Sequence, residues 1–189
     1  YGWYRKGPIG SDFHIPEVLP HLFDKSIAYV RSRLKDAESE KPFFLYLPLT
    51  APHTPIVPLG RFKGMSGCGD YGDYVCEVDW CVGEVMAALE RRGVADHTLL
   101  IFTSDNGPEQ PAYVHARDYG HFSMAHFRGI KRDVWEGGHR IPFIARWPGV
   151  TPANETCEQL ITLGDFMATC AEIVGVDLPR DAGEDSVSM

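Results

Sequence analysis

The stretch TLLIFTSDNG, residues 98–107, decides the fold class. Residues 98–103 form a short, continuous apolar run, which is typical of a strand that is buried on both faces. Residues 104–107 then bring a hydroxyl, a carboxylate and an amide directly to the end of that strand. Because ligands of open α/β sheets bind beyond the carboxyl ends of the strands, this junction predicts a site as well as a fold.

Apolar patterns on both sides of this stretch predict the other elements. Two more continuous apolar runs predict buried strands at residues 43–47 and 141–147. Helical spacing of apolar residues predicts helices from about residue 17 to the segment 33–41, from 70 to 92, and from 163 to 174. Residues 104–132 are predicted to be a long loop. This alternation predicts an α/β fold, with a mostly parallel sheet flanked by helices.

Composition narrows the classes of function. The 189 residues are 44% hydrophobic and 23% charged, as expected of a folded domain with a sizeable core. The net charge is −8, and the sequence contains no block of Lys and Arg, so no nucleic-acid partner is expected. No run approaches the roughly 20 apolar residues that a membrane span needs, so none is expected in this segment.

Asp105 and Asn106 are candidate metal ligands. A carboxylate and an amide carbonyl are hard oxygen donors of the kind that bind Ca²⁺ or Mg²⁺. Asp-Asn-Gly is also common in ordinary turns, so the residues alone leave both interpretations open.

His53 and Lys131 are candidates for contact with a substrate. His53 lies in the sequence Ala-Pro-His-Thr-Pro, and flanking prolines stiffen the loop around a possible donor or general acid. Lys131 belongs to residues 128–132, where three cations fall within five positions and could hold an oxyanion. An exposed loop histidine and a solvated basic turn are the alternatives.

Five segments follow one another in a characteristic order along the chain: residues 51–55, 71–79, 102–107, 128–131 and 136–142. In this order they closely resemble the arylsulfatase family, which belongs to the alkaline phosphatase superfamily. The resemblance extends roughly from Asp12 to Asp185, and it implies a partial alkaline-phosphatase-like sulfatase domain from a sulfuric ester hydrolase.

The resemblance also implies a role for each candidate residue. Asp105 and Asn106 match the second pair of ligands for a divalent cation, usually Ca²⁺, with Mg²⁺ as the alternative. His53 matches the histidine that hydrogen-bonds the sulfate or its leaving-group oxygen, and Lys131 matches the lysine that contacts the sulfate. The implied nucleophile is a formylglycine hydrate, and the implied partner is a small-molecule or glycan sulfate ester, such as an aryl sulfate or a sulfated carbohydrate.

Other parts of the family pattern have no match. The nucleophile motif is Cys/Ser-x-Pro/Ala-x-Arg, and the best partial match, residues 123–127, has Phe127 where the arginine belongs. The first pair of aspartates and a Lys-x-His segment also lack a match. We therefore expect residues 1–189 to be the C-terminal part of the catalytic domain, with the nucleophile and the small C-terminal subdomain lying outside. The resemblance implies a periplasmic, secreted or lysosome-like location.

Two alternative functions remain open at this point. One is a phosphatase or phosphodiester hydrolase of the same superfamily, because the nucleophile that distinguishes it lies outside these residues. The other is a non-catalytic half-domain that binds anions or glycans. Candidates for lining the substrate pocket lie in the predicted loop: Tyr113, His115, Arg117, His121 and His126.

Overall fold

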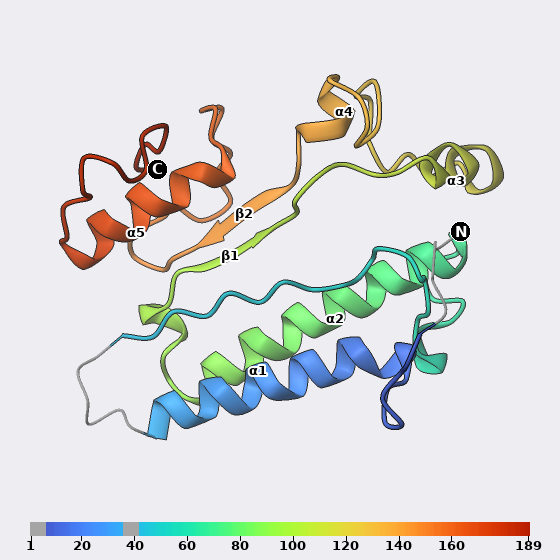
Figure 1. The fold of residues 1–189 in the computed structure, drawn as a ribbon, viewed down its shortest axis with the longest axis horizontal. Coiled ribbons are helices and arrows are strands. Elements are labelled where there is room, and N and C mark those ends of the chain that lie inside the picture. Colours follow the sequence, from blue (N-terminus) through green and yellow to red (C-terminus); the bar gives the residue numbers. More distant parts are fainter. Residues whose placement is uncertain (1–6, 36–41) are drawn as a thin grey trace. The chain divides into compact units, whose positions relative to one another are not determined.

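The computed structural model describes residues 7–35 and 42–189, which divide into two compact units, Tyr1–Thr151 and Pro152–Met189. Among the described residues, the first unit contains four α-helices and two strands, and the second contains one α-helix. Figure 1 labels these elements. Within the described ranges, no helix is long and apolar enough to cross a membrane. In chain order the elements are α1 Val18–Lys35, α2 Gly69–Arg91, β1 Leu100–Thr103, α3 Pro111–Tyr119, α4 Glu136–His139, β2 Phe143–Arg146 and α5 Phe166–Val174.

Helices α1 and α2 form the main core of the first unit. Leu19 and Phe23 of α1 are buried in one cluster with Tyr74, Val78 and Cys81 of α2. The three α2 residues are spaced four and three positions apart, which places them on one side of the helix. The predictions of helices near residues 17–33 and 70–92 are confirmed.

An extended segment, residues 43–49, lies over these helices without forming a strand. Phe43 and Leu45 pack against a second buried cluster, and Leu47 packs against the first. Phe44 and Tyr46 point the other way and are 72% and 75% exposed. The prediction of a strand buried on both faces is therefore wrong for the described residues, because only every second side chain is covered.

The sheet pairs β1 with β2 in antiparallel register, with Leu100 opposite Arg146 and Thr103 opposite Phe143. Strands form where they were predicted, within 98–103 and 141–147, but the prediction that they are buried is wrong: β1 is half-buried, and Ile144 and Ala145 of β2 are exposed. The sheet was expected to be mostly parallel, whereas these two strands pair antiparallel. The chain leaves β1 at Thr103 and re-enters at Phe143 beside it, so β2 must run in the opposite direction.

The predicted loop 104–132 contains a helix, α3, and the predicted helix 163–174 begins later than expected. Pro111 starts α3, and Gly120 ends it with a left-handed φ of 64°. In the second unit a 3-10 turn, Leu163–Asp165, precedes α5. Asp165 accepts hydrogen bonds from the backbone of Thr162 and Val187, and these bonds lower the pKa of its carboxyl.

Candidate functional site

Backbone hydrogen bonds join three separate segments at the end of β1. The N–H of Gly107 donates to the carbonyl of Gly138 at 2.8 Å. Lys131 donates to Pro108 at 2.8 Å, and Gly137 donates to Arg128 at 2.8 Å. The loop that carries Asp105 and Asn106 is therefore fixed to the segment that carries Lys131. We call this arrangement, residues 104–108 with 128–131 and 136–139, the glycine clasp.

Glycine is required at three positions of the glycine clasp. A Cβ atom on Gly107 would collide with the carbonyl oxygen of Gly137. A Cβ on Gly137 would collide with the carbonyl of Gly129, and one on Gly138 with that of Ile130. These neighbours are backbone atoms, so they cannot rotate out of the way. Close approach of backbone to backbone explains the glycines that follow Asn106 and Glu136.

Asp105 and Asn106 lie side by side in the loop that follows β1. Asp105 is exposed and Asn106 is half-buried, and the hydroxyl of Ser104 donates to the carbonyl of Asn106 at 3.0 Å. Their adjacent oxygens suit a hard cation, which takes about six to eight oxygen ligands when it is Ca²⁺. Across residues 7–35 and 42–189, no three His, Cys, Asp or Glu side chains gather as a metal site. The pair therefore fits part of a cation site.

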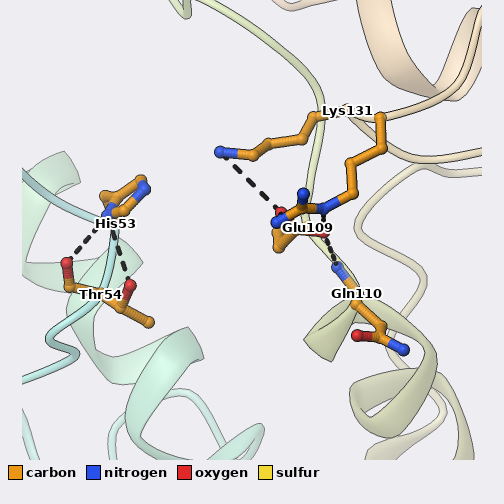
Figure 2. A network of polar contacts seen from close by, with 6 residues as sticks. His53, Thr54, Glu109, Gln110 and Lys131 are labelled. Carbon is orange, nitrogen blue, oxygen red and sulfur yellow. Dashed lines mark hydrogen bonds and ion pairs between the residues drawn. The ribbon is translucent and has the colours of Figure 1, made fainter. Parts of the chain in front are cut away.

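His53 lies exposed in the loop that precedes α2. Its Nδ1 lies 2.8 Å from the carbonyl oxygen of Thr54 and 3.4 Å from the Thr54 hydroxyl (Figure 2). Because a carbonyl oxygen only accepts, Nδ1 carries the hydrogen, and Nε2 is the ring nitrogen that remains for a substrate. No described contact joins His53 to Lys131, so the structure does not link these two candidates directly.

The three cations of residues 128–132 have different surroundings. The guanidinium of Arg128 lies 3.9 Å from the ring centre of Trp135. Arg132 binds Glu109 through Nε at 2.9 Å and Nη2 at 2.7 Å. The Lys131 side chain points toward the same carboxylate (Figure 2), with Nζ 4.0 Å from it. The Lys131 side chain is 27% exposed. The Arg132 guanidinium also holds the pKa of Glu109 below its usual range.

Two buried carboxylates of α2 organise the loop between His53 and this helix; both lie in the segment 71–79 but were not predicted as site residues. Glu77 accepts a hydrogen bond from the N–H of Leu59 at 2.9 Å. Asp73 accepts from the N–H of Gly64 at 2.7 Å and from the N–H and hydroxyl of Ser66 at 2.9 and 2.7 Å. Their position on the apolar side of α2 is the feature of the sequence that could have predicted their burial.

The expected pocket-lining residues divide into two groups. His115 stacks on Tyr71 with ring centres 4.7 Å apart, and His121 lies 6.5 Å from the same ring. Burial and the nearby His121 lower the pKa of His115. The other three lining candidates, Tyr113, Arg117 and His126, are exposed.

Comparison with known proteins gives the family and the fold. The sulfatase family model matches residues 16–176. An N-acetylgalactosamine-6-O-sulfatase of Bacteroides thetaiotaomicron is 41% identical over 98% of this chain and 36% of its own length. Human arylsulfatase D is 39% identical over 89% of this chain and 28% of its own length. The chain spans about a third of the length of these curated relatives.

A solved sulfatase structure from Bacteroides thetaiotaomicron, described in the context of glycosaminoglycan metabolism, has a similar fold. Its TM-score is 0.82 at 36% identity, over 93% of this chain and 36% of that one. The prediction of a partial α/β domain of the alkaline-phosphatase-like sulfatase kind is confirmed. The order of motifs, the glycine clasp and these likenesses agree, and the chain belongs to the sulfatase family.

Proposed function

We propose that the full-length protein carrying this chain hydrolyses sulfate esters, and that residues 1–189 form the later part of its catalytic domain. The observation that carries the proposal is the glycine clasp. It fixes the Asp105–Asn106 pair and Lys131 at the same end of β1, in a chain of the sulfatase family. The nucleophile is proposed to be a formylglycine hydrate outside these residues, one hydroxyl oxygen of which attacks sulfur while the bond from sulfur to the alcohol oxygen breaks.

In this proposal Lys131 and the Asp105–Asn106 pair act on the negative charge of the sulfate. The Lys131 ammonium is partly shielded from water, which strengthens its attraction for a sulfate oxygen. Asp105 and Asn106 would hold part of a Ca²⁺ or Mg²⁺ site, and the cation would polarise the sulfate as a Lewis acid. Stabilising charge that develops in the transition state is the largest contribution expected of such a site.

His53 is proposed to protonate the leaving-group oxygen. The contact with Thr54 fixes the hydrogen on Nδ1 and orients the ring. When Nε2 is also protonated, its N–H can donate to the alcohol or phenol oxygen as the ester bond breaks. The Glu77 and Asp73 contacts hold the loop that follows, which limits movement of the His53 segment.

The proposed substrate is a sulfated carbohydrate, with aryl sulfates as convenient probes. Support comes from the first relative, which is named for a sulfated amino sugar, and from the solved structure associated with glycosaminoglycans. A periplasmic, secreted or lysosome-like location remains part of the same proposal, and it rests on the resemblance to the arylsulfatase family.

The proposal is tested by comparing an aryl sulfate with the matching aryl phosphate as substrates of the full-length protein. We expect turnover of the sulfate, loss of activity after chelation of divalent cations, and about a hundredfold loss in kcat/KM for Lys131→Ala. Lys63→Ala, at an exposed lysine of the same unit, is the matched control and should change little. Preferred turnover of the phosphate would favour a phosphatase, and glycan binding without turnover would favour a binding half-domain.

A further inference from the structure

A single carboxylate is shared by two neighbouring cations beside the proposed sulfate site. Arg132 binds Glu109 through two nitrogens, at 2.9 and 2.7 Å. Lys131 reaches the same group only to 4.0 Å. The Glu109 side chain is 30% exposed, so it is partly shielded from solvent.

A backbone hydrogen bond brings Lys131 close to the residue that precedes Glu109. Lys131 donates its N–H to the carbonyl of Pro108 at 2.8 Å, and Pro108 is the residue before Glu109. The glycine clasp therefore holds the start of the Lys131 side chain next to a carboxylate. If no other cation bound Glu109, its carboxylate would form an ion pair with Lys131, and the ammonium would be less available to a sulfate oxygen.

Arg132 is well suited to bind the carboxylate of Glu109. A guanidinium presents a planar fork of donors that matches a carboxylate, whereas an ammonium is a compact charge on a flexible chain. The observed distances follow this preference, because the short contacts belong to Arg132 and the long one to Lys131. Arg128, the third cation of the segment, lies over Trp135 and makes no described contact with Glu109.

We propose that Arg132 is a positioning residue that binds Glu109 and so prevents this carboxylate from competing with sulfate for Lys131. The inference rests on the proposed function, because it takes Lys131 as the sulfate contact. Without Arg132, the Glu109 carboxylate would attract the Lys131 ammonium and repel an incoming sulfate. Without both Glu109 and Arg132, Lys131 would again be available.

The test is a double-mutant cycle in the full-length protein, with inorganic sulfate as a competitive inhibitor and an aryl sulfate as substrate. Arg132→Gln should raise both the inhibition constant of sulfate and the KM about three- to tenfold, with a smaller change in kcat. Glu109→Gln combined with Arg132→Gln should recover most of that loss. Arg91→Gln removes an exposed arginine and the same unit of charge on α2, and it should leave both constants within about twofold.

The cycle separates this inference from simpler explanations. If Arg132 contacts sulfate itself, the double variant will bind sulfate no better than Arg132→Gln, and the inference is overturned. An unchanged inhibition constant of sulfate and an unchanged KM in Arg132→Gln would also overturn the inference. Turnover of the aryl sulfate by the unaltered protein would in that case still support the proposed function. If the unaltered protein neither hydrolyses the ester nor binds sulfate, the proposed function itself fails. The Arg132 side chain is 72% exposed, so thermal unfolding should show that the variant folds normally.

Discussion

Two carboxylates one helical turn apart on α2 illustrate how surroundings set the behaviour of a side chain. Asp73 and Glu77 are 3% and 1% exposed. Hydrogen bonds from the backbone of Ser66 and Gly64 lower the pKa of Asp73. Glu77 accepts one described hydrogen bond, and burial raises its pKa. Both contribute to holding the loop behind His53, but only Asp73 is better stabilised as a charge than in water.

This difference predicts opposite pH dependences for the two isosteric amide variants. We expect Asp73→Asn to lower the thermal unfolding midpoint of the full-length protein by several degrees near pH 7, because the amide cannot accept all three bonds. The folded pKa of Asp73 is lowered, so its stabilisation is complete above the ordinary value of 3.8 and is lost as the pH falls through the folded value. The difference in thermal unfolding midpoint between Asp73→Asn and the unaltered protein should therefore become smaller below about pH 4.

Glu77→Gln is the matched comparison. The raised pKa means that ionisation of Glu77 is less favourable in the folded state, so the carboxylate reduces stability as the pH rises above its ordinary value of 4.5. Glutamine can still accept from the N–H of Leu59 without a buried charge. Thermal unfolding midpoints should be measured for both proteins from pH 3 to 8. The midpoint of Glu77→Gln minus that of the unaltered protein should increase as the pH rises. A parallel pH profile for the two variants would contradict both assignments.

At the scale of elements, the glycine clasp should be sensitive to one methyl group. Gly137→Ala places a Cβ against the carbonyl of Gly129, so α4 must move away from the segment that carries Lys131. We expect at least a tenfold loss in kcat/KM for an aryl sulfate, because displacement of about 1 Å can cost two orders of magnitude. The control is Gly83→Ala on α2, where a Cβ meets nothing within 4 Å. It should keep full activity and gain about 0.5–1 kcal/mol in the free energy of unfolding.

The elements also show which parts of the fold could be predicted from the sequence. The period of apolar residues and helix capping are local properties, so α1, α2 and the positions of both strands could be predicted. Pro111 and Gly120 are the local signals that mark the two ends of α3. Strand direction and the covering of residues 43–47 depend on partners far away in the chain. The site residues came from ordered motifs, but the hydrogen bond from Gly107 to Gly138 joins positions 31 apart, which no local pattern contains.

At the scale of the whole molecule, the described residues leave an apolar face unpaired. Phe44 and Tyr46 project from an extended segment that has no strand partner within residues 7–35 and 42–189. Large exposed aromatics beside an unpaired backbone are typical of a surface that packs against more protein. This agrees with a chain that spans about a third of its relatives, and it supports the proposal that the catalytic domain is completed by other residues.

The same reasoning predicts what residues 1–189 can do by themselves. Asp105 and Asn106 offer two protein ligands, whereas Ca²⁺ takes about six to eight oxygens, so calorimetry should detect only weak binding, with a Kd of about 1 mM or above. The proposed nucleophile is absent from these residues, so the isolated chain should not turn over an aryl sulfate, while the full-length protein should. Sulfatase turnover by the isolated chain would show that its own residues supply the attacking group. Tight Ca²⁺ binding would show that residues 1–189 supply more ligands to the cation than Asp105 and Asn106.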